Sequence, residues 1–150
     1  MFVIVHGGFG GGWEWTPVAQ TLRESGHVVF TPTLSGMGER SHLGPGLGRN
    51  QPVATFTEPI HLTGSVARVP RAFIRCTGHE LDVGGDPIEP MAARARTEGW
   101  PYRELRAPHD PHLFDPTATA ATLEELAAAA STDRRPSARP LPANGTSALR

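Results

Sequence analysis

The sequence predicts an α/β fold in which helices flank a mostly parallel sheet. An apolar run, a helix and a second apolar run follow one another within residues 1–43, and a similar alternation recurs within 65–130. Strands that alternate with helices form parallel sheets, because each helix returns the chain to the end at which the strand began. Glycine and proline cluster in 44–64 and 131–150, which we interpret as a linker and a tail.

The first block reads as a strand, a helix and a second strand. Phe2–Val5 is fully apolar and suits a strand buried in a parallel sheet. Thr16 followed by Pro17 indicates a helix that begins with a hydroxyl cap, and Gly26 marks its end. We expect the second strand over His27–Thr31. The helix carries an apolar stripe formed by Val18, Ala19 and Leu22.

Residues 44–64 show no sustained period of a strand or a helix. A structureless stretch of about 20 residues is uncommon inside a compact domain. Beyond it we expect a strand over Arg71–Cys76, a helix over Ile88–Thr97 and a strand over Tyr102–Leu105. Met91, Ala92 and Ala95 share one face of that helix, and Gly99 stops it.

A last helix is predicted from Asp115 as its cap and Pro116 as its first residue. Its apolar stripe consists of Leu123, Leu126, Ala127 and Ala130. From residue 131 onward the chain is rich in proline, serine and arginine, so we expect a disordered tail.

The composition argues against several classes of function. A formal net charge of −1 gives no electrostatic reason to expect nucleic acid as a partner. The single cysteine, Cys76, excludes an internal disulfide and reads as a small core residue. No apolar run approaches the length of a membrane span, and Phe2–Val5 is too short for a signal-peptide core, so we expect a cytoplasmic protein.

We also expect no metal and no cofactor. Two clusters combine histidines with acids, but neither has the spacing of a recognised metal site. These clusters are His109, Asp110 and His112 in one segment, and His79, Glu80 and Asp82 in another.

A glycine-rich loop directly after the first strand is the most informative motif. It begins with His-Gly-Gly at 6–8. Acyl transfer needs backbone N–H donors aimed at the oxygen that becomes an oxyanion, and glycines let the backbone approach a ligand closely. A dinucleotide loop requires Gly-x-Gly-x-x-Gly, but the sixth residue counted from Gly8 or Gly10 is Trp13 or Trp15. We interpret the segment as an oxyanion loop, with a plain tight turn or a nucleotide site as alternatives.

Both blocks resemble parts of one known family. The sequence FVIVHGGFGGGWEW, continued to GMGERSHL, closely resembles the start of the esterase and hydroxynitrile-lyase-like branch of the α/β-hydrolase superfamily. The sequence from SVARVPRAFIRCT to APHDPHLFDP resembles its C-terminal end. The resemblance covers residues 1–43 and 65–128. It implies an α/β-hydrolase-like fold, small carboxylic esters as substrates, and an oxyanion-hole N–H from Gly8.

The resemblance also implies an acid and a base. His109 follows the last strand, where the chain order of nucleophile, acid and histidine places the general base. Asp86, with Asp82 as second choice, would orient His109 and stabilise its imidazolium form. Either carboxylate can equally be a solvated loop acid or a helix cap. The family usually has glycine before this histidine, where this chain has Pro108.

The nucleophile of the family has no counterpart in this chain. Such enzymes place a serine in a Gly-x-Ser-x-Gly turn between strand and helix, and this pattern does not occur in the sequence. Residues 44–64 stand where the family has on the order of 100 further residues, including that turn. An internal truncation explains both the short length and the unpatterned linker. It would also leave raw sheet edges, through which copies of the chain could form a homo-oligomer.

We therefore expect an esterase-like hydrolase whose activity is impaired, because loss of the serine costs several orders of magnitude in rate. The rival reading is a non-catalytic remnant that acts as a binding or assembly module or has no function. Ester hydrolysis and lyase chemistry both remain open at this point.

Overall fold

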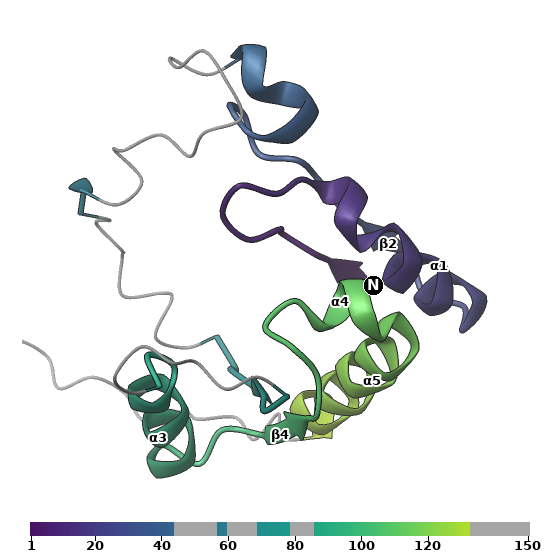
Figure 1. Cartoon of the computed structure of the whole chain (residues 1–150). Coiled ribbons are helices and arrows are strands. Elements are labelled where there is room, and N and C mark those ends of the chain that lie inside the picture. Colours follow the sequence, from purple (N-terminus) through teal and green to yellow (C-terminus); the bar gives the residue numbers. More distant parts are fainter. Residues whose placement is uncertain (44–56, 60–68, 79–85, 133–150) are drawn as a thin grey trace, which may run out of the picture.

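The computed structural model describes residues 1–43, 57–59, 69–78 and 86–132 (Figure 1). Its described part contains two short parallel strand pairs. Strand β1 (Phe2–Val3) pairs with β2 (Val29–Phe30), and β3 (Phe73–Cys76) pairs with β4 (Tyr102–Leu105). The predicted strands therefore occur, shortened at their ends in three cases and with the predicted bounds at Tyr102–Leu105.

Helices surround and connect these strands (Figure 1). The α-helices are α1 (Thr16–Glu24), α3 (Glu89–Thr97), α4 (Pro111–Phe114) and α5 (Pro116–Thr132), and the 3₁₀ helices are η1 (Gly12–Trp15) and η2 (Gly38–Leu43). The sequence did not predict η1, η2 or α4, because such short turns contain too few residues to show a helical period. No helix in the described ranges is long and apolar enough to cross a membrane.

Helix α1 follows directly from η1. Thr16 is its first residue and Trp15 holds the cap position without a side-chain hydrogen bond, so the prediction that Thr16 caps this helix is wrong. The uninterrupted η1 turn already supplies helical backbone before Thr16. At the other end Gly26 adopts a φ of 85°, a left-handed conformation that glycine tolerates, and ends the helix as predicted.

The main apolar core lies between α1, α5 and the inner face of the β1–β2 pair. The predicted α1 stripe is fully buried there, and Phe2, Ile4 and Leu123 pack against it. Helix α5 thus belongs to the C-terminal block in sequence but packs along α1 of the first block. The buried members of this cluster are Val18, Ala19, Leu22, Val29 and Ala120.

The prediction that Phe2–Val5 is a strand buried on both faces is wrong for one face. Phe2 and Ile4 point toward α1, whereas Val3 and Val5 are exposed. Successive side chains of a strand point to opposite faces. Helix α1 covers one of these faces, and no element in the described part of the chain buries the other.

The second strand pair has a thinner core. Helix α3 packs on β3, and its Ala92 and Ala95 are fully buried, while Met91 of the predicted stripe is half-exposed. Gly99 takes a φ of 69° and ends the helix as predicted. Arg75 on β3 binds Glu89 at the start of α3, and Arg96 at its end binds the same carboxylate.

Helix α5 begins as predicted. The Asp115 side chain accepts a hydrogen bond of 2.9 Å from the Ala118 N–H, and Pro116 is the first helical residue. The helix continues to Thr132, so its last two residues lie in the predicted tail. The predicted linker, apart from residues 57–59, and the tail from residue 133 lie outside the described residues.

Candidate active site

The glycine-rich loop is held in place by the buried imidazole of His6. Its Nε2 atom accepts a hydrogen bond of 3.1 Å from the Leu34 N–H, and its Nδ1 atom lies 2.7 Å from the Gly7 carbonyl oxygen. A ring nitrogen that accepts an N–H carries no hydrogen, so Nδ1 holds the proton and donates to Gly7. His6 thereby connects the loop after β1 to the segment after β2.

The hydrogen bond from His6 Nδ1 to the Gly7 carbonyl oxygen also orients the peptide group between Gly7 and Gly8. No described peptide bond is cis, so the Gly7 carbonyl and the Gly8 N–H point in opposite directions. Because the carbonyl faces His6, the Gly8 N–H faces away from it. Gly8 is exposed, so its N–H is placed where a ligand could accept it.

Phe9 follows Gly8 in an unusual backbone conformation. Its φ is 64°, and it is the one described residue other than glycine with a positive φ. Such a conformation costs on the order of 1 kcal/mol or more and is retained where the surroundings impose it. The side chain of Phe9 is largely exposed beside the predicted oxyanion loop.

The end of the loop packs against the backbone that follows β2. The Gly12 N–H donates a buried hydrogen bond of 2.8 Å to Thr33 Oγ1. A Cβ atom on Gly12 would overlap the Thr31 carbonyl oxygen. Glycine is therefore required at this position because two backbone segments touch.

Two carboxylates lie against the same loop. The Glu14 carboxylate packs on Gly10, and the Glu39 carboxylate on Gly11. The Thr33 hydroxyl is hydrogen-bonded to Glu39 and holds the pKa of that carboxyl below its usual range, with the Arg40 guanidinium contributing. A phosphate in the loop would be repelled by the ionised Glu39, which argues against the nucleotide-site alternative.

The candidate base lies on a loop fixed by a second close backbone contact. The Gly78 N–H donates to the Ala107 carbonyl at 2.9 Å, and a Cβ atom on Gly78 would lie 2.7 Å from the Ala107 carbonyl carbon. The loop after β4 is thus pressed onto the end of β3, which places His109 beside Cys76. The sequence offered no signal for Gly78, since its tight neighbour is 29 positions away in the chain.

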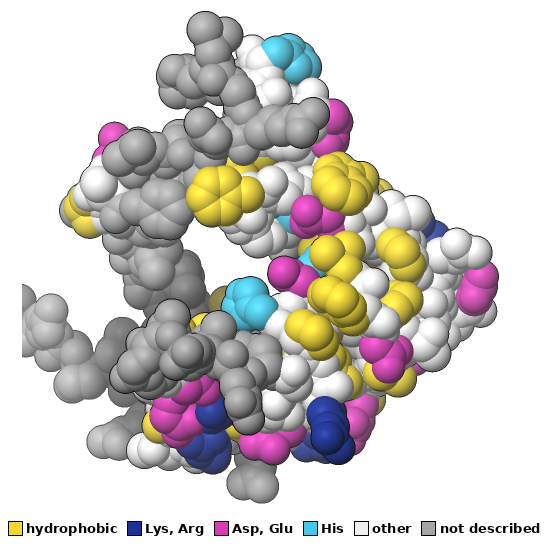
Figure 2. Space-filling view, viewed as in Figure 1, with side chains coloured by type: hydrophobic (Ala, Val, Ile, Leu, Met, Phe, Trp, Pro, Cys, Tyr) yellow, Lys and Arg dark blue, Asp and Glu magenta, His cyan; other side chains and the backbone are white. Residues whose placement is uncertain are grey.

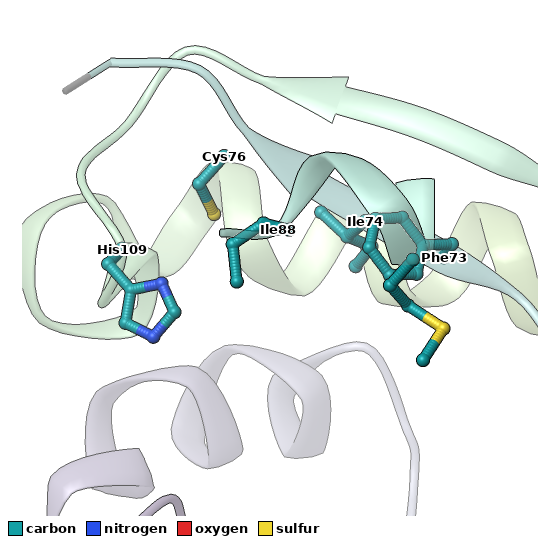
Figure 3. Close-up of a pocket in the computed structure, with 6 residues that line it drawn as sticks. Phe73, Ile74, Cys76, Ile88 and His109 are labelled. Carbon is teal, nitrogen blue, oxygen red and sulfur yellow. The ribbon is translucent and has the colours of Figure 1, made fainter. Parts of the chain in front are cut away.

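His109 borders an open pocket of about 240 Å³. Figure 3 shows the imidazole and the Cys76 thiol at one end of the pocket, with Ile74 and Phe73 toward the other. The remaining lining residues are Ile88 and Met91, so the pocket is mainly apolar. Its size and lining suit a small apolar group.

Cys76 is half-buried and lines this pocket. The prediction that it is a small core residue is therefore wrong. Burial raises the pKa of the thiol, and the nearby Asp110 carboxylate raises it further. The thiol is therefore protonated at neutral pH. Since the thiolate is the reactive form, Cys76 is a poor nucleophile.

Asp86, the first choice for the acid, is engaged at the start of α3. One carboxylate oxygen accepts the Ile88 N–H at 2.8 Å, and the other pairs with Arg75 at 2.5 Å. These contacts lie just before α3, whose N-cap is Ile88 without a side-chain hydrogen bond, so Asp86 does not cap this helix. The acid role of Asp86 stays a prediction. Asp82, the second choice, lies outside the described residues.

A stacked aromatic pair joins the His109 segment to the glycine loop. The ring of His112 in α4 stacks on Trp15 of η1, with centroids 4.1 Å apart and an interplanar angle of 6°. His112 is only 6% exposed, and burial lowers its pKa, with Asp110 and Glu14 opposing the shift. Within the described part of the chain, His112 Nε2 and Trp15 Nε1 have no hydrogen-bond partner.

This stack brings the two halves of the candidate site to the same side of the molecule. In Figure 1 the purple loop after β1 and the green loop after β4 both extend away from α1 and α5. In Figure 2 histidine and acidic side chains lie beside a band of hydrophobic side chains on this face. The sequence missed the role of His112, because a histidine in a short helix carries no pattern that predicts stacking.

The described residues contain no group of three side chains arranged to hold a metal ion. No model of a protein family matches the chain, and no solved structure matches it. Part of the chain is similar to a carbendazim hydrolyzing esterase from Nocardioides sp. (strain SG-4G), with 52% identity over 42 residues. This match spans 28% of the chain and 17% of the esterase.

Proposed function

We propose that this chain is an esterase-like hydrolase of the α/β-hydrolase type that acts on small carboxylic esters, with impaired turnover. The observation that carries the proposal is the His6 bond to Gly7, which turns the Gly8 N–H outward as a donor. The local similarity to an esterase supports the same reaction class. The resemblance of the two blocks to the superfamily supports the fold.

In this proposal the ester carbonyl oxygen accepts the Gly8 N–H, which stabilises the negative charge that develops on it. The apolar pocket beside His109 takes the small acyl or alcohol group. Water is the nucleophile in this proposal, since the Cys76 thiol is protonated and therefore unreactive. His109 removes a proton from that water as it attacks, and returns the proton to the alcohol that leaves.

Turnover by this route is slow. A positioned general base contributes about 10²–10⁴-fold over the uncatalysed reaction, and the covalent step of a serine hydrolase is absent. The proposal therefore predicts weak ester hydrolysis that depends on His109 and on no serine.

The test is hydrolysis of p-nitrophenyl acetate by the wild-type chain and by His109→Ala. Loss of activity to the background rate in His109→Ala is expected, while His42→Ala, which removes an exposed histidine of η2, keeps it. Far-UV circular dichroism verifies that both variants fold. Equal rates in the wild type and His109→Ala would refute the proposal.

Treatment with a fluorophosphonate, followed by intact mass, tests the nucleophile separately. We expect no adduct, because no described serine lies in a strand-to-helix turn of the Gly-x-Ser-x-Gly type. A single adduct that disappears in His109→Ala would show instead a working serine and histidine pair.

The second candidate is a non-catalytic binding or assembly module. The engagement of Asp86 with Arg75 and the Ile88 N–H favours it, because both carboxylate oxygens then have partners at the start of α3. A folded chain without measurable ester hydrolysis would support this candidate.

A further inference from the structure

One face of the β1–β2 sheet is apolar and exposed, and no element in the described part of the chain covers it. In this register Phe2 lies opposite Val29 and Val3 opposite Phe30. Paired residues of a sheet share a face, so the first pair points to α1 and the second points away from it. We call this second surface the outer sheet face. It consists of Met1, Val3, Val5, Val28 and Phe30.

This exposure is unusual for a parallel sheet. Parallel strands are normally covered on both faces, and here α1 and α5 cover only the inner one. The five side chains of the outer sheet face are each between 53% and 82% exposed. They are contiguous by register and alternation, and they include no charged residue.

The area is large for a monomer. At these exposures the five side chains present on the order of 500 Å² of apolar surface, which matches the largest patches of typical monomers, patches that are often functional. Two such faces in contact would bury on the order of 1,000 Å² in total, which is the lower limit for a specific interface.

We propose that the outer sheet face binds the same face of a second copy of this chain, related by a two-fold axis. A sheet face whose side chains are all uncharged is complementary to its own copy, because stacked sheets pack with interdigitating side chains. In this dimer the second copy covers the face of the parallel sheet that α1 and α5 leave exposed. It uses faces of strands rather than their edges, and it does not depend on ester hydrolysis.

The test is sedimentation of the full chain over about 1–100 µM, the range in which a modest interface dissociates. The wild type is expected to form a dimer at the upper end. Val3→Glu and Phe30→Glu each place a charge on the outer sheet face and are expected to be monomers throughout. Both side chains are exposed already, so the core is unchanged.

Val69→Glu is the matched control, because Val69 is 59% exposed and lies outside this face. It is expected to dimerise like the wild type. A wild type that is still monomeric at about 100 µM would overturn the proposal. The outer sheet face would then bind a different partner. Dimers that persist in both Val3→Glu and Phe30→Glu would also overturn it, since association would then use strand edges or another surface.

Discussion

The two strand pairs of this chain follow the same pattern in sequence but are stabilised differently. In the first block the strands are two residues long, and hydrogen bonds of the buried side chains of His6 and Thr33 hold the backbone around them. In the second block the strands are four residues long, and ion pairs of Arg75, Arg96 and Arg103 surround them. A short strand pair can persist when side chains buried beside it replace the missing ladder.

The difference has an energetic consequence. A buried donor or acceptor left without its partner costs about 1–3 kcal/mol, whereas an exposed ion pair contributes about 0–1 kcal/mol and weakens in salt. The first block should therefore be sensitive to single substitutions and insensitive to salt, and the second block the reverse.

The largest effect is expected from Gly12→Ala. The new Cβ atom would overlap the Thr31 carbonyl oxygen, and backbone cannot move aside as a side chain can. We expect a loss of about 3 kcal/mol in the free energy of unfolding, measured by urea denaturation. Gly7→Ala is the matched control, because its Cβ atom would meet nothing within 4 Å. Equal stability of the two variants would show that the backbone of the first block can shift to accommodate the Cβ atom.

A somewhat smaller effect is expected from His6→Ala. The substitution removes the partners of the Leu34 N–H and the Gly7 carbonyl at a buried position. We expect destabilisation by about 2 kcal/mol in the same denaturation experiment, with no dependence on salt. A change below about 0.5 kcal/mol would mean that water replaces both hydrogen bonds without cost.

The stability of the fold should depend on pH through His112, whose ring stacks on Trp15 and connects the two blocks. Burial lowers its pKa in the folded chain below the usual value of 6.5, so the unfolded chain binds this proton more readily. Its contribution to stability is therefore fully present above pH 6.5 and is lost as the pH falls below that value. Thermal unfolding from pH 8 to pH 5 measures this loss. His112→Phe keeps the stack on Trp15 and should reduce the loss.

The smallest effect is expected from Arg103→Gln. Arg103 binds Glu125 of α5 at 2.5 Å, but both side chains are about half-exposed. We expect a small loss in the free energy of unfolding that disappears in about 1 M sodium chloride, because salt screens exposed charges. A larger loss that persists in salt would contradict the contrast between the two blocks.

Local features of the chain were predictable from the sequence. The strand Tyr102–Leu105, the left-handed glycines at 26 and 99 and the Asp115 cap of α5 match their predictions. Each depends on a residue and its near neighbours, whose conformational preferences act within a few positions. The buried stripe of α1 was also predictable, because it repeats with the period of the helix.

Contacts between distant segments were not predictable in this way. The sequence assigned α5 to the second block, but α5 packs on α1, and His112 stacks on Trp15 across 97 positions. Gly78 and Gly12 are required because backbone from elsewhere touches them. The exposed face of Val3 and Phe30 likewise depends on what is absent around it in the described fold. Burial is a property of neighbours in space, and an apolar strand reads the same whether one face or both are covered.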